Sequence, residues 1–372
     1  MDKKIIHITL GKANPNRLNG VNKVVNSLID AQVKLGYDSE LWGITHNCVH
    51  NYPERNYQTR IFKDTRSKFK LSSDLKRAIN ELSSKEVIVH LHGAFLPQLY
   101  SVSRLLRKNN IPYIHTPHGG YNLKALEVSK LQKRIYMRFF EKKLVNNAAC
   151  VQLLGESELK GLNLNFLAKS FAIIPNGQDV LDTEDLDPRN KSDINLVFLG
   201  RIDIKTKGLD LLTDAVKRIK QELKVHLTII GDGGDIEQLK SRISESELDD
   251  QISFAGALFG KEKFQELIKA DALCLVSRNE GMPGVVLEAG AVGIPVLISE
   301  QTNMVPYIWQ YDAGWWMKDY SVESLCESLF QMYKDKKNSI MKQKGHNARK
   351  MISEKFAWDN IAASLITEYA KA

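Results

Sequence analysis

Two glutamates separated by seven residues are the most conspicuous pair of chemically capable side chains in this 372-residue sequence. Glu280 lies in a glycine-containing loop that follows an apolar run, and Glu288 lies on a helix predicted over residues 284–291. The pair could simply be a helix cap and a solvent-exposed helical residue, since charged helix residues are mostly exposed. Because the flanking residues are glycine and apolar residues, we instead expect both carboxylates to hold different parts of one ligand.

The start of that helix is a second candidate binding element. Pro283 precedes it. Proline is favoured there because an N–H at that position would have no acceptor within the helix, so its absence costs nothing. The N–H groups of Gly284, Val285 and Val286 are then expected to point out of the helix. Such a helix N-terminus attracts phosphate groups and hydroxyl oxygens.

A basic loop follows the strand predicted over residues 194–199. Gly200-Arg201 and Lys207-Gly208 flank it. Arginine as a bidentate fork and lysine as a point charge could neutralise the two charges of a pyrophosphate. Alone, the pattern is also that of an ordinary solvated loop. The later segment IIGDGGD lacks the third glycine of a dinucleotide fingerprint and is interpreted as a turn.

The first half of the chain offers a loop and a histidine. The Gly/Asn-rich loop over residues 9–20 ends at Gly20, where backbone can approach a phosphate closely. His118 follows a predicted strand and precedes two glycines. No metal site is expected: imidazoles without carboxylate partners make a poor catalytic centre, and the Asp-Leu-Asp motif lies in a polar linker. The residues weighed for a metal are His90, His92, His115, His118, Asp185 and Asp187.

Short β-branched runs alternate with helical patterns along the whole chain, which is typical of parallel α/β sheets. The polar stretch 176–193 interrupts the alternation, so two α/β units are predicted. Ligands of such sheets bind at the carboxyl ends of strands. The predicted strands are 5–10, 39–44, 87–92, 113–115, 149–153, 194–199, 226–230, 252–254, 272–276 and 295–298, and the predicted helices are 21–35, 74–82, 97–108, 209–223, 236–244, 261–270 and 284–291.

Composition excludes other classes of protein. With 43% hydrophobic and 26% charged residues the chain is ordinary for a globular protein. No apolar run reaches the roughly 20 residues of a membrane span. The N-terminus does not resemble a secretion signal, and the four dispersed cysteines fit a reducing compartment. Residues 1–190 carry a net charge of +10 and residues 191–372 a net charge of −2, so the first half is expected to face an anionic partner.

Together these motifs resemble the family-4 retaining glycosyltransferases of the GT-B fold. The likeness rests on Glu280 and Glu288, the basic loop after residue 199, the Pro-Asn-Gly at 175–177, His118-Gly119, and an ending like that family's last helix. It implies two Rossmann-like α/β domains facing each other across a cleft. An acceptor-binding domain is expected over 1–174, a nucleotide-sugar domain over 175–355, and a helix over 356–372 that returns to the first domain. Members often carry a glycine pair where this chain has Asn19-Gly20.

The resemblance also implies residue roles. Arg201 and Lys207 would hold the donor diphosphate, Glu288 the ribose hydroxyls, and Glu280 would lie beside the donor sugar. His118 would lie near the reacting sugar, so the expected catalytic residues are His118, Arg201, Lys207 and Glu280. The remaining expected contacts to the nucleotide sugar are Gly20 at the β-phosphate, Gly256 and Leu258 at the base, and Gly281, Met282, Pro283, Gly284 and Val285.

The implied activity is retaining transfer of a hexose-type sugar without a metal or other cofactor. A UDP-sugar is the favoured donor and a GDP-sugar the alternative. The acceptor would be a glycan or a lipid-linked molecule of bacterial-type cell-surface polysaccharide synthesis. A nucleotide-sugar epimerase of the same fold is the competing hypothesis. A nucleic-acid-binding protein is a weaker one, since no recognition motif accompanies the basic charge.

The basic excess has a local source in residues 130–143, KLQKRIYMRFFEKK. A helix with this sequence could bury its aromatic residues in the domain, or it could dock on anionic lipid. The chain is expected in the cytoplasm, and docking of this helix on lipid would give it a peripheral position on the inner face of the membrane. Trp315-Trp316 are interpreted as packing residues.

Overall fold

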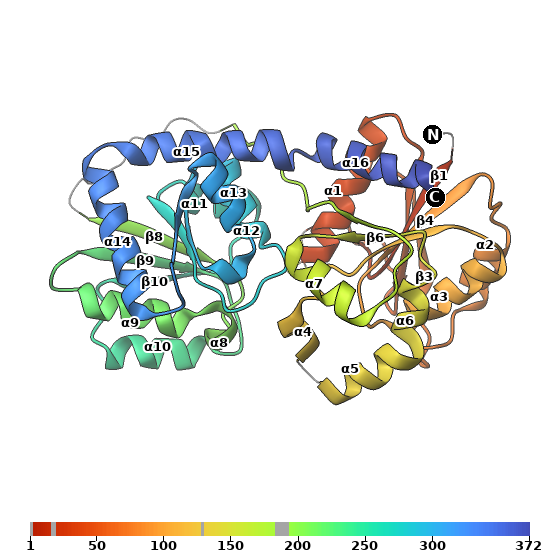
Figure 1. The fold of residues 1–372 in the computed structure, drawn as a ribbon, viewed down its shortest axis with the longest axis horizontal. Coiled ribbons are helices and arrows are strands. Elements are labelled where there is room, and N and C mark those ends of the chain that lie inside the picture. The colour runs from red at the N-terminus through yellow and green to blue at the C-terminus, as the bar shows by residue number, and fades with distance from the viewer. Residues whose placement is uncertain (1–2, 16–19, 128–129, 183–192) are drawn as a thin grey trace. The chain divides into compact units, whose positions relative to one another are not determined.

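The computed structural model describes residues 3–15, 20–127, 130–182 and 193–372, and they form two compact units (Figure 1). The first unit comprises Met1–Gly177 together with Trp358–Ala372, and the second comprises Gln178–Ala357. The sequence placed these boundaries at residues 174 and 355, a few positions earlier in each case. The motif at Asp185 and Asp187 lies outside the described residues.

Within the described residues of the first unit, seven parallel strands form one sheet in the order β3-β2-β1-β4-β5-β6-β7. β1 is central, and its neighbour β4 comes from much later in the chain. The strand order therefore reverses beside β1. The strands are β1 (Lys4–Leu10), β2 (Ser39–Thr45), β3 (Thr59–Lys63), β4 (Val87–His92), β5 (Tyr113–Thr116), β6 (Cys150–Leu153) and β7 (Phe171–Ile173).

Helices cover both faces of this sheet. Ile5 of β1 and Ile88 of β4 pack against α1 and α16, which lie side by side in Figure 1. Ile6 and Ile8 point to the opposite face, where α2, α3 and α6 supply apolar partners. The helices are α1 (Gly20–Lys34), α2 (Ser73–Asn80), α3 (Pro97–Lys108), α4 (Leu123–Glu127), α5 (Lys130–Tyr136), the π-helix η1 (Met137–Glu141), α6 (Lys142–Val145), α7 (Glu156–Asn165) and α16 (Trp358–Lys371).

The second unit, over its described part, has six parallel strands in the order β10-β9-β8-β11-β12-β13. They are β8 (Ile194–Leu199), β9 (Val225–Ile230), β10 (Ile252–Gly256), β11 (Ala272–Leu275), β12 (Val296–Ile298) and β13 (Gly314–Trp316). The helices are α8 (Ile204–Lys207), α9 (Leu209–Ile219), α10 (Ile236–Glu245), α11 (Gly260–Leu267), α12 (Gly284–Ala291), the 3₁₀ turn η2 (Glu300–Thr302), α13 (Val305–Tyr311), α14 (Val322–Lys337), α15 (Ile340–Met351) and the π-helix η3 (Ile352–Phe356).

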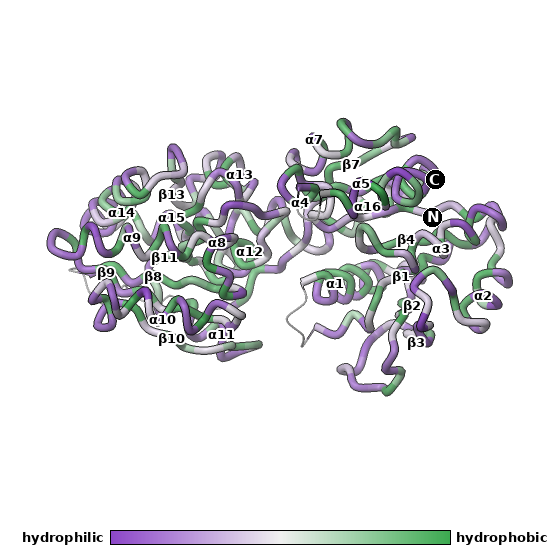
Figure 2. The backbone as a smooth tube through the Cα atoms, turned by 90° about the horizontal axis from the view of Figure 1, so that it is seen from below, coloured by the Kyte–Doolittle hydropathy of each residue, from purple (hydrophilic) through white to green (hydrophobic). Residues whose placement is uncertain are grey.

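The predicted fold class is confirmed: both units are α/β with parallel sheets, and α16 belongs to the first unit. The strands β3, β7 and β13, which are short and lie at sheet edges, were not predicted from the sequence. The apolar α12 was predicted at its observed bounds, and it is among the hydrophobic helices of Figure 2. Trp315 is buried in β13 and donates its indole N–H to Asp335 at 2.8 Å, so it is a packing residue.

Candidate functional site

The carboxyl ends of β8 and β11 carry most of the predicted site residues. β9 and β10 lie on one side of β8, and β11 to β13 lie on the other, so the strand order reverses between β8 and β11. In parallel α/β sheets this reversal point is where ligands bind, because the two connecting loops diverge there. The backbone N–H of Arg278 donates to Thr206 across the two loops at 2.8 Å and ties them together.

The loop after β8 presents Lys207 to the loop after β11. Lys207 Nζ lies 2.6 Å from Glu280 Oε1, and the two side chains are only 17% and 14% exposed. Ser277 Oγ donates to the same carboxylate oxygen at 2.8 Å. A shielded pair of this kind attracts more strongly than a surface pair, and it holds both charged heads at one place. The structure therefore brings together two residues that are 73 positions apart.

The single-turn helix α8 fixes the direction of Lys207. Asp203 accepts a hydrogen bond from the N–H of Thr206 at 2.8 Å, which is a standard N-cap, and Gly208 ends the turn with φ +69°. A Cβ at position 208 would lie 2.2 Å from the carbonyl oxygen of Val276. Gly208 is thus required both by its φ and by the close approach of β11's loop.

Hydrogen bonds with residues 301–303 hold the loop that carries Glu280. The N–H of Glu280 donates to Gln301 at 3.1 Å, and Asn303 Nδ2 donates to the carbonyls of Glu280 and Gly281 at 2.7 and 3.2 Å. Asn303 itself has φ +61°, a conformation that asparagine tolerates. Asn303 was not among the residues predicted from the sequence. Its one signal was its place in a turn after a predicted strand.

Glu288 is buried rather than solvent-exposed. Only 7% of the residue is accessible, and its Oε2 accepts from Lys263 Nζ of α11 at 2.8 Å. A carboxylate buried against an apolar helix face needs such a partner, because an unpaired buried charge is costly. Lys263 was missed, since nothing in the sequence connects α11 with α12 before the fold is known.

The N-terminus of α12 differs from the prediction in one group. The N–H of Val286 donates to the carbonyl of Pro283 at 3.0 Å, so Val286 is not available to a ligand in this arrangement. Helix geometry leaves the N–H groups of Gly284 and Val285 without intrahelical acceptors. Met282 and Val285 pack partly against the second unit's core.

The remaining predicted residues of the second unit lie on the same sheet edge. Arg201 follows β8, is exposed, and lies 3.4 Å from Asp203. Gly256 ends β10 with φ +73° and accepts a hydrogen bond from the N–H of Gly231 at 2.8 Å. Leu258 follows it and packs partly into the core.

Two predicted residues belong to the first unit. Gly20 is the first residue of α1, and the residues before it, 16–19, lie outside the described part. His118 follows β5 with φ +52°, an uncommon backbone conformation for a residue other than glycine. The buried carboxylate of Glu158 accepts the next residue's N–H, that of Gly119, at 2.6 Å and holds this turn. Burial lowers the pKa of His118 to about 4, so its ring is neutral at pH 7.

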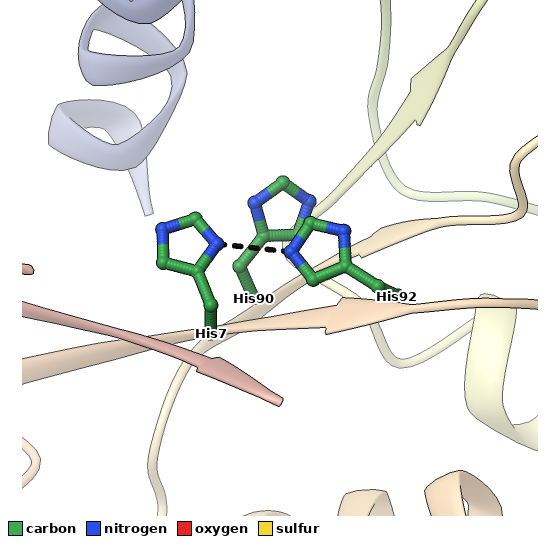
Figure 3. Close-up of side chains that lie close together, drawn as sticks. All are labelled: His7, His90 and His92. Atoms are coloured by element: carbon green, nitrogen blue, oxygen red, sulfur yellow. Dashed lines mark hydrogen bonds between the residues drawn. The ribbon is translucent and has the colours of Figure 1, made fainter. Parts of the chain in front are cut away.

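The buried imidazoles of His7, His90 and His92 lie close together (Figure 3), and His92 also contacts His118. The nitrogens of His7, His90 and His92 approach within 4.8 Å of one another, as metal ligands would. However, His7 Nδ1 and His92 Nε2 are 2.9 Å apart, a hydrogen-bond distance. Two nitrogens on one tetrahedral Zn²⁺ would be about 3.3 Å apart. The other ring nitrogens of the three residues have polar partners in Gln32, Thr116, Tyr369 and His118. These contacts describe a hydrogen-bonded cluster.

His115, which the sequence grouped with these residues, lies on the opposite face of the sheet. It is the register partner of Leu91, whereas His90 and His92 alternate with Leu91 along β4. Its Nε2 contacts the hydroxyl of Tyr121 at 2.9 Å, and that hydroxyl donates to Glu141 at 2.7 Å. The four histidines weighed for a metal therefore do not form one group.

Two models of known protein families match this chain. The model described as Glycosyltransferase Family 4 matches residues 18–180, and the model described as Glycosyl transferases group 1 matches residues 184–351. The chain belongs to the family-4 glycosyltransferases. The predicted family is thereby confirmed.

Individual relatives of this family-4 glycosyltransferase are distant. An uncharacterised 41.2 kDa protein in the cps region of Klebsiella pneumoniae is 25% identical over 58% of the chain, and the match spans only 61% of that protein. An uncharacterised glycosyltransferase of Methanocaldococcus jannaschii is 26% identical over 91% of the chain and 90% of its own length. The phosphatidyl-myo-inositol mannosyltransferase of Mycobacterium tuberculosis is 24% identical over 76% of the chain and 73% of its own length.

Solved structures share the fold. Sucrose-phosphate synthase from Thermosynechococcus elongatus superimposes with a TM-score of 0.79 at 17% identity, over 99% of both chains. The Anabaena protein HepE, crystallised with UDP and glucose, gives a TM-score of 0.75 at 14% identity over the full length of both chains. The predicted GT-B architecture agrees with the fold of these structures.

Proposed function

We propose that this family-4 glycosyltransferase transfers a hexose-type sugar from a nucleotide-diphosphate sugar to a glycan or lipid-linked acceptor. The observation that carries the proposal is the shielded Lys207–Glu280 pair at the strand reversal of the second sheet. Lys207 and Arg201 would bind the diphosphate, and Glu280 would lie beside the sugar. Glu288, held by Lys263, would accept the ribose hydroxyls.

The chemistry that these groups support is departure of a diphosphate. When the sugar–phosphate bond breaks, negative charge grows on the leaving oxygen, and fixed cations stabilise it without reorganising. Lys207 and the N-terminus of α12 supply such fixed positive charge. We propose a metal-independent reaction in which the acceptor attacks the same face that the diphosphate leaves, so that the anomeric configuration is retained.

A UDP-sugar is the proposed donor, and a GDP-sugar is the alternative. HepE, which shares the fold, was crystallised with UDP and glucose. The proposed pathway is bacterial-type cell-surface polysaccharide synthesis, in keeping with the cps-region relative of Klebsiella pneumoniae. A lipid-linked acceptor is in keeping with the mycobacterial relative, whose name states a phosphatidyl-myo-inositol substrate.

A thermal-shift panel of UDP- and GDP-sugars tests the donor class. A ligand that binds only the folded state raises the melting temperature, and a concentration of 100 Kd adds about 2.7 kcal/mol. At least one of these donors is expected to raise it, and UMP should raise it less because it lacks the second phosphate. No shift with any UDP- or GDP-sugar would contradict the proposal. Incubating the stabilising donor without acceptor separates the epimerase hypothesis, since only an epimerase would convert the sugar.

The basic segment offers an apolar surface suited to a membrane-bound acceptor. Leu131, Ile135 and Phe139 follow one another at a spacing of four and are 72%, 52% and 52% exposed. Arg134 and Arg138 are exposed beside them. Apolar side chains flanked by cations bind the boundary of anionic bilayers. No helix among the described residues has the length and hydropathy to cross a bilayer. We propose a cytoplasmic protein that docks on the membrane through this surface.

Replacing both Leu131 and Ile135 with aspartate is expected to weaken binding to phosphatidylglycerol-containing vesicles by at least tenfold. The substitution removes the apolar area that would be buried, and each leucine or isoleucine is worth about 1.5–3 kcal/mol when fully buried. Vesicle co-sedimentation measures the change. Leu164→Asp is the matched control, because Leu164 is also 72% exposed in the first unit but lies on α7. Equal binding by the double variant and the control would contradict the docking proposal.

A further inference from the structure

His118 is one end of a series of side-chain hydrogen bonds on one face of the first sheet. His7 of β1 is the register partner of His90 of β4, and His92 follows on the same face. This face is the one that α1 and α16 cover. The side chains of His7, His90 and His92 are buried, so each bond in the series must match a donor with an acceptor.

At the other end of the series, Gln152 determines which group donates and which accepts in each hydrogen bond. Gln152 Nε2 donates to the backbone carbonyl of Ile174 at 2.9 Å. A carbonyl can only accept, so the amide of Gln152 cannot be turned around. Its Oε1 consequently faces Thr116, whose hydroxyl donates to it at 2.7 Å. Since that hydroxyl proton is used, Thr116 accepts from His90 Nε2, which lies 2.6 Å away.

Tyr369 of α16 connects His90 with Gln32, and its hydroxyl determines which way the amide of Gln32 is turned. Burial lowers the pKa of His90 well below its usual value, so the ring is neutral and its Nδ1 is an acceptor. The hydroxyl of Tyr369 therefore donates to His90 Nδ1 at 2.7 Å and accepts from Gln32 Nε2 at 3.3 Å. This orients Gln32 with its Oε1 toward His7, where Ser39 Oγ also donates to it at 3.0 Å.

The alternation of donor and acceptor continues through three imidazoles. Gln32 Oε1 accepts from His7 Nε2 at 2.8 Å, so His7 Nδ1 is the acceptor for His92 Nε2 at 2.9 Å, the bond drawn in Figure 3. His92 Nδ1 is then the acceptor for His118 Nε2 at 3.0 Å. Burial keeps all three rings neutral at pH 7. His118 is left with its proton on Nε2 and its lone pair on Nδ1.

We propose that Gln32 and Tyr369 are positioning residues that hold His118 in its Nε2–H tautomer, so that His118 Nδ1 accepts a hydrogen bond from a sugar hydroxyl. The tautomer follows from the hydrogen-bond contacts of these neutral buried rings, whereas the hydroxyl ligand rests on the proposed function. A ring whose lone pair is already directed needs no rearrangement when the ligand binds. The same ring would repel an acceptor atom at that place, and it would therefore distinguish a hydroxyl from a carbonyl or an ether oxygen.

Nitrogen-15 NMR of the full chain, labelled at histidine, tests the tautomer. Bare and protonated ring nitrogens have well-separated shifts, and His118→Gln identifies the signals of His118. We expect His7, His90, His92 and His118 all as neutral Nε2–H rings at pH 7. A Nδ1–H tautomer or an imidazolium at His7, His92 or His118 would overturn the proposal. So would a stoichiometric metal ion whose removal by EDTA shifts the His7 and His92 signals.

A tyrosine pair tests the positioning role. Tyr369→Phe removes the hydroxyl that orients Gln32, so His118 should become a mixture of tautomers and kcat should fall about fivefold, as for one lost hydrogen bond. Tyr113→Phe is the matched control: its buried hydroxyl donates to the carbonyl of Leu144, outside the series. The control should keep both the His118 tautomer and kcat within twofold. Unchanged NMR signals in Tyr369→Phe, or the same loss of kcat in both variants, would overturn the role. If the wild-type chain transfers no sugar, the proposed function fails, while the NMR result still decides the tautomer.

Discussion

Replacing Lys207 with alanine is expected to lower the rate of sugar transfer by about a hundredfold to a thousandfold. That is the usual cost of removing one fixed group that stabilises a leaving charge. The loss should be large because Lys207 is shielded and aligned by Glu280, whose carboxylate Ser277 also holds, so solvent cannot replace it. Turnover with a saturating donor measures the effect on the transfer step, and calorimetry measures the effect on donor affinity. Donor binding and turnover like those of the wild type would contradict the site assignment.

Two further variants separate charge from folding. Lys205→Ala removes an exposed lysine two residues away on the same short helix, and it should leave turnover within about twofold. Lys207→Ala alone also leaves Glu280 with a shielded charge that has lost its cation, which costs stability. Adding Glu280→Gln removes that charge. The double variant should therefore regain melting temperature relative to Lys207→Ala without regaining activity, and recovery of activity would contradict the assignment.

Acidification from pH 6.5 to pH 5 is expected to destabilise the first unit steeply. Burial lowers the pKa of five imidazoles, so below pH 6.5 they bind protons only after unfolding. Burial raises the pKa of two carboxyls to about 7, so in the same range they bind protons only in the native state. The net uptake on unfolding rises to about three protons near pH 5, where the free energy of unfolding should fall by about 4 kcal/mol per pH unit. The imidazoles are His7, His90, His92, His115 and His118, and the carboxyls are Glu141 and Glu158.

Hydrogen exchange followed by mass spectrometry measures this change within the full chain. Protection in β4 and α16 should fall between pH 6.5 and pH 5 after correction for the intrinsic exchange rate. The second unit is the internal control, because all seven of these groups belong to the first unit. A loss of protection that is equal in β4 and β11, or no loss in β4, would contradict the prediction.

Local features of this protein could be predicted from sequence. The bounds of α12 follow from Pro283, the glycines and an apolar run, all of which act within one turn of helix. The burial of Glu288 follows from the apolar residues around it on that helix. The strand ends that precede Arg201, His118 and Glu280 follow from the alternation of strands and helices, because the parallel strands of each sheet end at one edge of that sheet.

What the sequence did not reveal are partners that only the fold brings together. Glu288 meets Lys263 from another helix, and Asn303 reaches back to the loop of Glu280. His90 contacts Tyr369, which is 279 positions away. No local period or motif encodes such contacts. In residues 130–143 the composition suggested a helix, but the buried Met137 and exposed Phe139 depend on the π-helical turn η1 within it.

The place of α16 in the sequence, after the whole of the second unit, affects the order in which the two units can fold during synthesis. The first unit needs residues 358–372 to cover Ile5, Ile88 and Ile114, yet these residues are translated after the whole of the second unit. The second unit is continuous in sequence and can complete its core earlier. Although domains usually fold in the order in which they emerge, here one apolar face of the N-terminal sheet is covered only in part, by α1, until α16 is made. We therefore expect the first unit, and not the second, to need protection by chaperones while translation continues.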